Sequence, residues 1–172
     1  NIHYGDIHTK FSNHLTVTPD NLPFINYDID LSKYGKTNFC KAGDVIFADA
    51  SEDYDAIGKA VEIIAVGGFT VISGLHTIHA RPLSDKLVVG FMGHYSQSIR
   101  FKSQIKRASQ GTKVLSISAK QLSSIIIYLP SLPEQKKIAD FLTAIDDKIE
   151  HVARQLEKTM EYKKGLLQQM FV

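Results

Sequence analysis

The C-terminal forty residues most constrain this fold, because they carry a heptad pattern that needs a second helix. Ten positions spaced alternately four and three residues apart run through them, and eight are apolar. The ten are Ile138, Leu142, Ile145, Ile149, Val152, Leu156, Thr159, Lys163, Leu166 and Met170. This spacing is typical of a coiled coil, in which a seam of apolar side chains is buried against a partner helix. We therefore expect a globular domain followed by a long helix whose coiled-coil interface consists of the eight apolar residues.

Two prolines and a capping signal mark the start of this helix. Pro130 and Pro133 end the preceding apolar run, and a proline is tolerated in the first helical turn, where N–H groups lack intrahelical partners. Ser131 and Glu134 have the S-x-x-E spacing of a capping box. A helix from Glu134 to the C-terminal residue 172 would contain 39 residues and extend about 58 Å at about 1.5 Å per residue.

Two interpretations of the helix are open. It packs as an amphipathic helix on its own domain, or it pairs with a partner. Its length favours the partner, because it exceeds the width of a domain built from the other residues. Thr159 and Lys163 interrupt the apolar seam, and such polar positions either select the register and partner or mark the end of the coiled coil.

The composition predicts one core plus the helix. The 172 residues are 44% hydrophobic, enough for one well-buried core but not for two independent domains. We expect a domain over residues 1–130 and a helical region over residues 131–172. No apolar run is long enough to span a membrane and no charged-then-apolar leader is present, so we expect a soluble protein with no membrane partner.

Cys40 is the only cysteine, which excludes an internal disulfide and a cysteine cluster for zinc. A single thiol fits a reducing cytoplasm, which is the location we expect. The first residue is Asn1 rather than methionine, which suggests a fragment or a processed form.

Positive charge is concentrated in one segment. Residues 1–80 carry 5 Lys/Arg and 10 Asp/Glu. Residues 81–132 carry 8 Lys/Arg and 1 Asp/Glu, and residues 133–172 carry 7 of each kind. Such a basic segment is a candidate surface for contacting the phosphates of a nucleic acid. The alternative is a solvated face with ordinary surface lysines.

The domain reads as an α+β fold of short twisted strands with a few helices. Strands are predicted at residues 45–48, 61–66, 69–74, 113–117 and 125–129, separated by glycine-containing turns. Between residues 84 and 109, apolar residues at helical spacing predict one or two helices, the second of which carries much of the positive charge. Gly111 lies where a glycine is expected after that helix.

No catalytic or metal-binding constellation is complete. The run Asn21-Leu22-Pro23-Phe24 partly resembles the base-clamping element of amino-methyltransferases, but Leu22 replaces its first proline and no G-x-G cofactor loop follows a first strand. His76 and His79 would point to opposite sides of a strand, and no third ligand is evident. The pattern of a metal-dependent nuclease, an Asp followed by Glu-x-Lys on adjacent strands, has no convincing match in the sequence. We therefore expect no catalytic residue, no metal and no cofactor.

Six motifs, taken in order, resemble one half of a specificity (S) subunit of a type I restriction-modification enzyme. They are YGDIHTK at 4–10, KAGDVIFADAS at 41–51, GK at 58–59, SGLHT at 73–77, GT at 111–112 and LPSLPEQKKIA at 129–139, the last followed by Leu142, Asp146 and Ile149. Each motif alone is weak, but their order is specific and they cover nearly the whole chain. Family members usually carry two target recognition domains, each followed by a long helix, and this sequence has one of each.

The resemblance implies a non-catalytic reader of DNA sequence. Such a subunit reads one half of a split double-stranded target, docks modification (methyltransferase) subunits and, through them, the restriction subunit. Its paired helices act as a ruler that spaces the two half-sites, here about 1.7 turns of duplex if the whole segment is helical. With one half present, two copies would form a homodimer through the C-terminal helix and read a palindromic site. Alternatively, the chain is one half of a full S subunit.

The candidate DNA-contacting residues are basic or polar side chains in or near these motifs. Cations suit phosphates and guanine edges, a glutamine can pair with adenine, and Gly111 lets the backbone approach closely. The set comprises Thr9, Lys10, Ser12, His76, Arg81, Arg100, Lys102, Lys106, Arg107, Gln110, Gly111, Thr112 and Lys113. For each of them, an ordinary surface or turn-stabilising role is the alternative.

Two other functions compete with DNA reading. A coiled-coil assembly or regulatory subunit would bind the methyltransferase without reading DNA, and it would need no basic segment. A small enzyme would need a catalytic group, and the sequence offers none. Salt-dependent binding to duplex DNA separates the first of these from a DNA reader.

Overall fold

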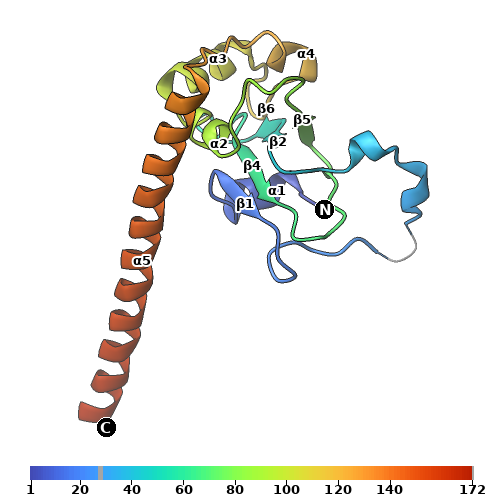
Figure 1. Ribbon diagram of the computed structural model, residues 1–172. Helices are drawn as coiled ribbons and strands as arrows, with labels where there is room; N and C mark the ends of the chain where they lie inside the picture. The colour runs from blue at the N-terminus through green and yellow to red at the C-terminus, as the bar shows by residue number, and fades with distance from the viewer. Residues whose placement is uncertain (27–28, 172) are drawn as a thin grey trace. The chain divides into compact units, whose positions relative to one another are not determined.

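The computed structural model describes residues 1–26 and 29–171, and the chain divides into two units, Asn1–Lys136 and Lys137–Val172 (Figure 1). The strands of the first unit are β1 (His14–Thr16), β2 (Val45–Ala48), β3 (Ala50–Ser51), β4 (Ala60–Ala65), β5 (Thr77–Ala80) and β6 (Leu115–Ser116). Its helices are α1 (Tyr4–Thr9), α2 (Phe91–Tyr95), α3 (Ile99–Ala108) and α4 (Ala119–Leu122), with 3-10 turns η1 (Leu31–Lys33) and η2 (Lys36–Asn38). Helix α5 (Leu132–Met170) begins in the first unit and makes up most of the second. The predicted α+β class with a long C-terminal helix is confirmed.

A mixed sheet with the strand order β1-β4-β2-β5 forms the centre of the first unit. Strand β1 runs parallel to β4, whereas β2 is antiparallel to both β4 and β5. All four residues of β2 are buried, which is expected for a central strand covered on both faces.

Alternate side chains of β2 enter different cores. Val45 and Phe47 pack with residues of α2 and α3, whereas Ile46 and Ala48 pack with residues of α1 and β1. Successive side chains of a strand point to opposite faces, so this one strand separates two hydrophobic clusters. The helices that carry candidate residues are thereby attached to both faces of one sheet.

Glu62 on β4 is a buried carboxylate that holds the start of α2. Its side-chain oxygens accept hydrogen bonds from the backbone N–H groups of Gly90 and Gly93, both at 2.7 Å. Burial raises the pKa of Glu62, while these backbone donors and the nearby His14 oppose the rise. An anion at a helix N-terminus is favourable because the first N–H groups lack intrahelical partners.

The first turn of α5 is fixed to the first unit by a buried amide. Gln135 is 1% exposed, and its Nε2 donates to the carbonyls of Lys86 (2.9 Å) and Pro130 (3.0 Å) while its Oε1 accepts from the Val88 N–H (3.0 Å). The Glu134 carboxylate accepts from the N–H and hydroxyl of Ser131, which is one half of the predicted capping pair.

Helix α5 begins at Leu132, two residues before the predicted start at Glu134. Val172, the last residue of the predicted range, lies outside the described residues. No helix of the described residues is both long and apolar enough for a membrane span.

Two predicted strands are wrong. Residues 125–129 form no strand, because side chains satisfy their backbone: Gln104 bonds both the N–H and the carbonyl of Ile126 (3.0 Å each), and the Tyr95 hydroxyl accepts from the Tyr128 N–H (3.2 Å). Residues 69–74 form only isolated bridges, Ile72 with Phe39 and Ser73 with Ile2. Apolar, β-branched sequence favours a strand only where a neighbouring strand is available.

Candidate nucleic-acid interface

Helix α3 carries four of the candidate cations around a buried apolar stripe. Phe101 and Ile105, one turn apart, are each 1% exposed and belong to the core. The hydroxyl of Ser98 caps the helix by accepting a hydrogen bond from the Phe101 N–H at 3.2 Å. Arg100 and Arg107 are exposed, and Lys102 and Lys106 are half-buried at the edges of the stripe. The helix thus places all four cations outside the core.

Aromatic rings hold two of these cations at different places. The Arg100 guanidinium lies 3.7 Å from the centre of the Tyr128 ring, and the Lys106 ammonium lies 5.0 Å from the centre of the Tyr54 ring. Such cation–π contacts orient a flexible cation while leaving its remaining donors available. Lys106 also forms an ion pair with Asp55.

Several candidates that are distant in sequence meet around residues 49–59, which we call the central segment. The N–H of Asp49 donates to the carbonyl of His76 (3.1 Å), and its carboxylate lies 3.2 Å from His76 Nδ1. The His8 ring nitrogen Nε2 lies 3.0 Å from the carbonyl oxygen of Ala50, and Ala50 pairs with Ser116 in a two-stranded sheet. The central segment therefore contacts four other parts of the first unit: the end of α1, His76, β6 and Lys106 of α3.

Residues 110–113 form an exposed turn next to β6. The backbone of Gln110 pairs with that of Ser116 through hydrogen bonds of 2.9 and 2.8 Å, which leaves the Gln110 side chain outside the ladder. Gly111 has a φ of 122°, and a Cβ there would lie 2.1 Å from the carbonyl oxygen of Val114. The glycine is therefore required by the turn itself, which presents Gln110, Thr112 and Lys113 to solvent.

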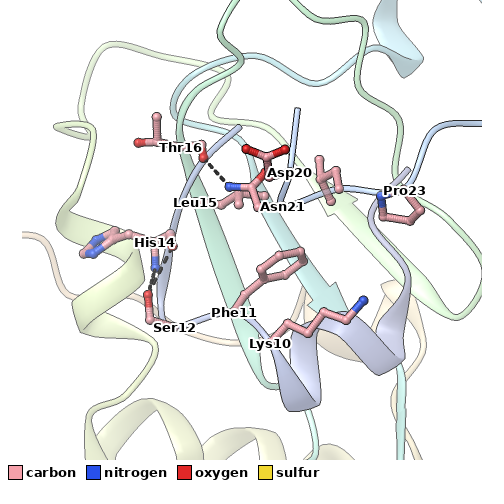
Figure 2. A pocket seen from close by; sticks show the side chains of 10 residues that line it. Lys10, Phe11, Ser12, His14, Leu15, Thr16, Asp20, Asn21 and Pro23 are labelled. Carbon is pink, nitrogen blue, oxygen red and sulfur yellow. Dashed lines mark hydrogen bonds between the residues drawn. The ribbon is translucent and has the colours of Figure 1, made fainter. Parts of the chain in front are cut away.

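The candidates at the end of α1 make local contacts. The Thr9 hydroxyl donates to the carbonyl of Gly5 (2.8 Å), and the Lys10 ammonium pairs with Asp6 (2.6 Å). Ser12 donates to the carbonyl of His14 (3.2 Å). Lys10 and Ser12 line a hollow of about 540 Å³, shown in Figure 2.

Arg81 has a structural role that the sequence analysis did not foresee. Its guanidinium donates to both carboxylate oxygens of Asp44 (2.8 and 2.6 Å) and to the carbonyls of Thr37 (3.1 Å) and Phe39 (2.7 Å). The Asp44 side chain is completely buried, and His79 adds a further contact at 2.8 Å. Because these donors are engaged inside the domain, we leave Arg81 out of the interface proposed below.

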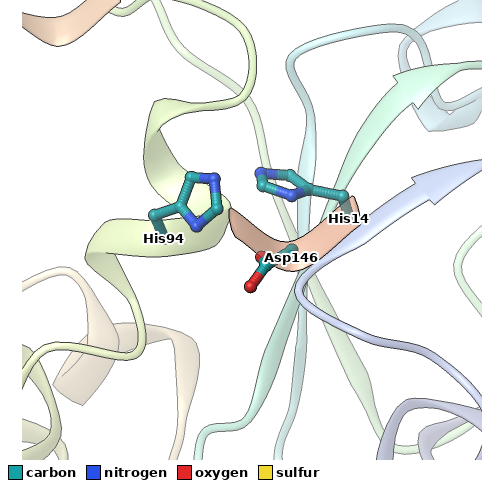
Figure 3. A group of neighbouring side chains, drawn as sticks. All are labelled: His14, His94 and Asp146. Carbon is teal, nitrogen blue, oxygen red and sulfur yellow. The ribbon is translucent and has the colours of Figure 1, made fainter. Parts of the chain in front are cut away.

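Two groups of side chains that could bind a metal make contacts inside the first unit. Cys40 lies near Asp44 and His79, but burial and then the Asp44 charge raise the pKa of the Cys40 thiol to about 11. The oxygens of Asp44 in this group accept hydrogen bonds from Arg81. His14 and His94 lie in edge contact with ring centroids 4.4 Å apart (Figure 3).

Lys59 lies in the GK motif at 58–59 but is not among the sequence-based candidates. Its ammonium donates to the carbonyl of His8 at 3.1 Å, which links the end of the central segment to α1. The pKa of Lys59 is lowered by partial burial and by the positive charge of Lys102. The only sequence signal was its position after Gly58, a pair too short to assign a role.

The chain belongs to a known family. Residues 7–161 match the family described as the type I restriction modification DNA specificity domain. This match includes the sheet, the central segment, α3 and most of α5, and it confirms the family suggested by the six motifs.

Two curated relatives share this family name. The chain is 30% identical over 133 residues to the putative type I restriction enzyme MjaX specificity subunit of Methanocaldococcus jannaschii, covering 75% of this chain and 30% of the relative. It is 34% identical over 77 residues to the type I restriction enzyme MjaVIII specificity subunit of the same organism, covering 45% of this chain and 18% of that relative. The chain thus spans less than a third of the length of either relative.

Proposed function

We propose that the first unit reads one half of a split DNA target as a non-catalytic specificity module of a type I restriction-modification system. The observation that carries this proposal is the gathering of α1, His76, the residue 110–113 turn and Lys106 of α3 around the central segment. Sequence-independent affinity for DNA comes from cations that replace counterions at the phosphates. Exposed polar side chains such as Gln110 suit base edges. The family description and the relatives' names as specificity subunits support the assignment to DNA specificity.

The second part of the proposal is that α5 pairs with another helix. Among the eight predicted interface residues, Ile138, Ile145, Ile149, Val152, Leu156, Leu166 and Met170 are exposed and Leu142 is half-buried in the single chain. An apolar stripe of this length is stable in water only when another helix covers it. We propose that the partner is a second copy or a second half of the subunit. The 39 residues of α5 would extend about 58 Å and act as the spacer between half-sites.

The remaining partners follow from this assignment. The module would dock modification subunits and, through them, the restriction subunit, and it would act in the cytoplasm, where the DNA is. It would hold neither a cofactor nor a metal for this task, because recognition needs only side-chain and backbone contacts.

The salt dependence of DNA binding tests the central claim. Replacing Arg107, an exposed cation of α3, with alanine should weaken binding to duplex DNA and reduce the slope of log K against log salt by about 0.9. Lys33→Ala in η1 is the matched control and should leave the slope unchanged. An unchanged slope for Arg107→Ala would remove Arg107 from the interface. No salt-dependent binding by the unmodified protein would instead favour the scaffold that binds the methyltransferase without reading DNA.

A further inference from the structure

Helix α3 lies directly against the turn of the central segment. Gly58 has a φ of 65°, and a Cβ there would lie 2.5 Å from Cγ2 of Ile105. Ile57 and Ile105 belong to the same core cluster. The missing side chain at Gly58 therefore lets the backbone of the turn contact α3. Lys102 and Lys106, which lie one turn apart on α3, flank this contact.

Lys59 adds a third cation at the same place. It follows Gly58 in the turn, and its ammonium is held by the His8 carbonyl at 3.1 Å. The positive charge of Lys102 helps to lower the pKa of Lys59, so the two ammonium groups lie in each other's field. Cations that repel each other in this way are stabilised by an anion placed between them.

An internal anion already lies beside these lysines. The Asp55 carboxylate forms an ion pair with Lys106, and the hydrogen bond from Lys106, followed by the charges of Lys106 and Lys102, holds the pKa of Asp55 below its usual value. The Asp55 N–H donates to the Asp53 carboxylate at 2.8 Å, which fixes the turn. The Asp55 side chain is 81% exposed and contributes nothing to the core. A carboxylate and a phosphate accept the same charge-assisted hydrogen bonds from lysine.

We propose that Lys59, Lys102 and Lys106 form a binding site for a DNA backbone phosphate, and that the Asp55 carboxylate occupies this site in the free protein. The inference rests on the proposed function. An incoming phosphate displaces Asp55 from Lys106, and the exchange is reversible because exposed ion pairs are weak. Displacing Asp55 costs the same free energy whatever the DNA sequence is. Asp55 therefore lowers the sequence-independent affinity of the protein for duplex DNA.

The test compares two neutralising variants of the same turn. Asp55→Asn should bind a duplex of random sequence about threefold to tenfold more tightly and give a salt slope steeper by about 0.9, because one more cation becomes available for phosphate. Glu52→Gln removes the same charge from the same turn, where Glu52 has no ion-pair partner among the described residues. It should change affinity less than about twofold. In the Asp55→Asn background, Lys102→Gln and Lys59→Gln should each return the slope toward that of the unmodified protein.

A second measurement does not involve DNA. Inorganic pyrophosphate should shift the side-chain NMR signals of Lys59 and Lys106, at lower concentration in Asp55→Asn than in the unmodified protein. DNA binding by Asp55→Asn that matches Glu52→Gln, or is weaker than that of the unmodified protein, would overturn the inference while leaving the proposed function intact. Pyrophosphate binding at these lysines together with an absence of DNA binding would support the site and contradict the proposed function.

Discussion

Asp44 has a completely buried side chain, and its charge is tolerated only because three neighbours bond it. Burial alone would raise its pKa, but hydrogen bonds from Arg81, from the Lys41 N–H and from His79 outweigh this and lower the pKa below 3.8. A carboxyl with a lowered pKa in the folded state contributes stability that is complete above its unfolded pKa and is lost as the pH falls from there through the lower folded pKa. The network therefore stabilises the edge of the sheet at neutral pH.

Replacing Arg81 with alanine should lower the free energy of unfolding by about 3 kcal/mol at pH 7, because a buried charge loses its main partner. The difference from the unmodified protein should shrink at acidic pH, as the pH falls through the lowered folded pKa of Asp44 and the protonated carboxyl no longer needs Arg81. Urea unfolding of both proteins at pH 7 and at acidic pH measures this difference in stability. Arg107→Ala, an exposed arginine, should cost less than about 0.5 kcal/mol. Full stability with weakened DNA binding would restore Arg81 to the interface.

At the scale of elements, the start of α5 depends on one side chain. The amide of Gln135 bonds two carbonyls and one N–H in a place that is 1% exposed. A buried polar group that loses its partner cannot recover that bond from water. Helix α5 is thus attached to the first unit by hydrogen bonds of its first turn.

Replacing Gln135 with alanine should lower the free energy of unfolding by about 1–3 kcal/mol, since it leaves the Val88 N–H and two carbonyls unpaired. Hydrogen exchange at the Val88 amide should become faster. Gln155→Ala, an exposed position of the same helix, is the control and should cost nothing, because alanine has the higher helix propensity. Equal stabilities of the two variants would show that the amide does not fix the helix.

At the scale of the chain, the first unit is followed by a helix whose apolar seam is largely exposed. Two copies joined through this seam would be related by a twofold axis, and a twofold protein should read a palindromic split site. Coexpression with a cognate modification subunit, followed by mapping of methylated adenines in the host genome, should give such a motif.

Ile149→Asp combined with Leu156→Asp should abolish both the dimer, measured by analytical ultracentrifugation, and the methylation, because two charges would be buried in the seam. His151→Asp, off the seam, should preserve both. A methylated motif without two symmetric halves would exclude the homodimer.

Local sequence predicted the features whose physical cause is local. The three-four spacing of apolar residues predicted α5, because residues three and four apart lie on one side of a helix. Ser131 with Glu134 predicted its start to within two residues, and the apolar run at 45–48 predicted β2. The paired interface of α5 stays a prediction, because it depends on a second chain.

Four features could be predicted from the amino-acid sequence alone: the α+β class, the long helix with its seam, the family and the segment that carries the positive charge. The use of those charges depends on the tertiary structure: Arg81 is bound to Asp44, while Lys106 forms an ion pair with Asp55. The tertiary structure also decided that residues 125–129 bond to side chains of α2 and α3 rather than to a strand. The physical reason is that helical periodicity arises between near neighbours in the chain, whereas ion pairs and strand partners depend on which distant segments the fold brings together.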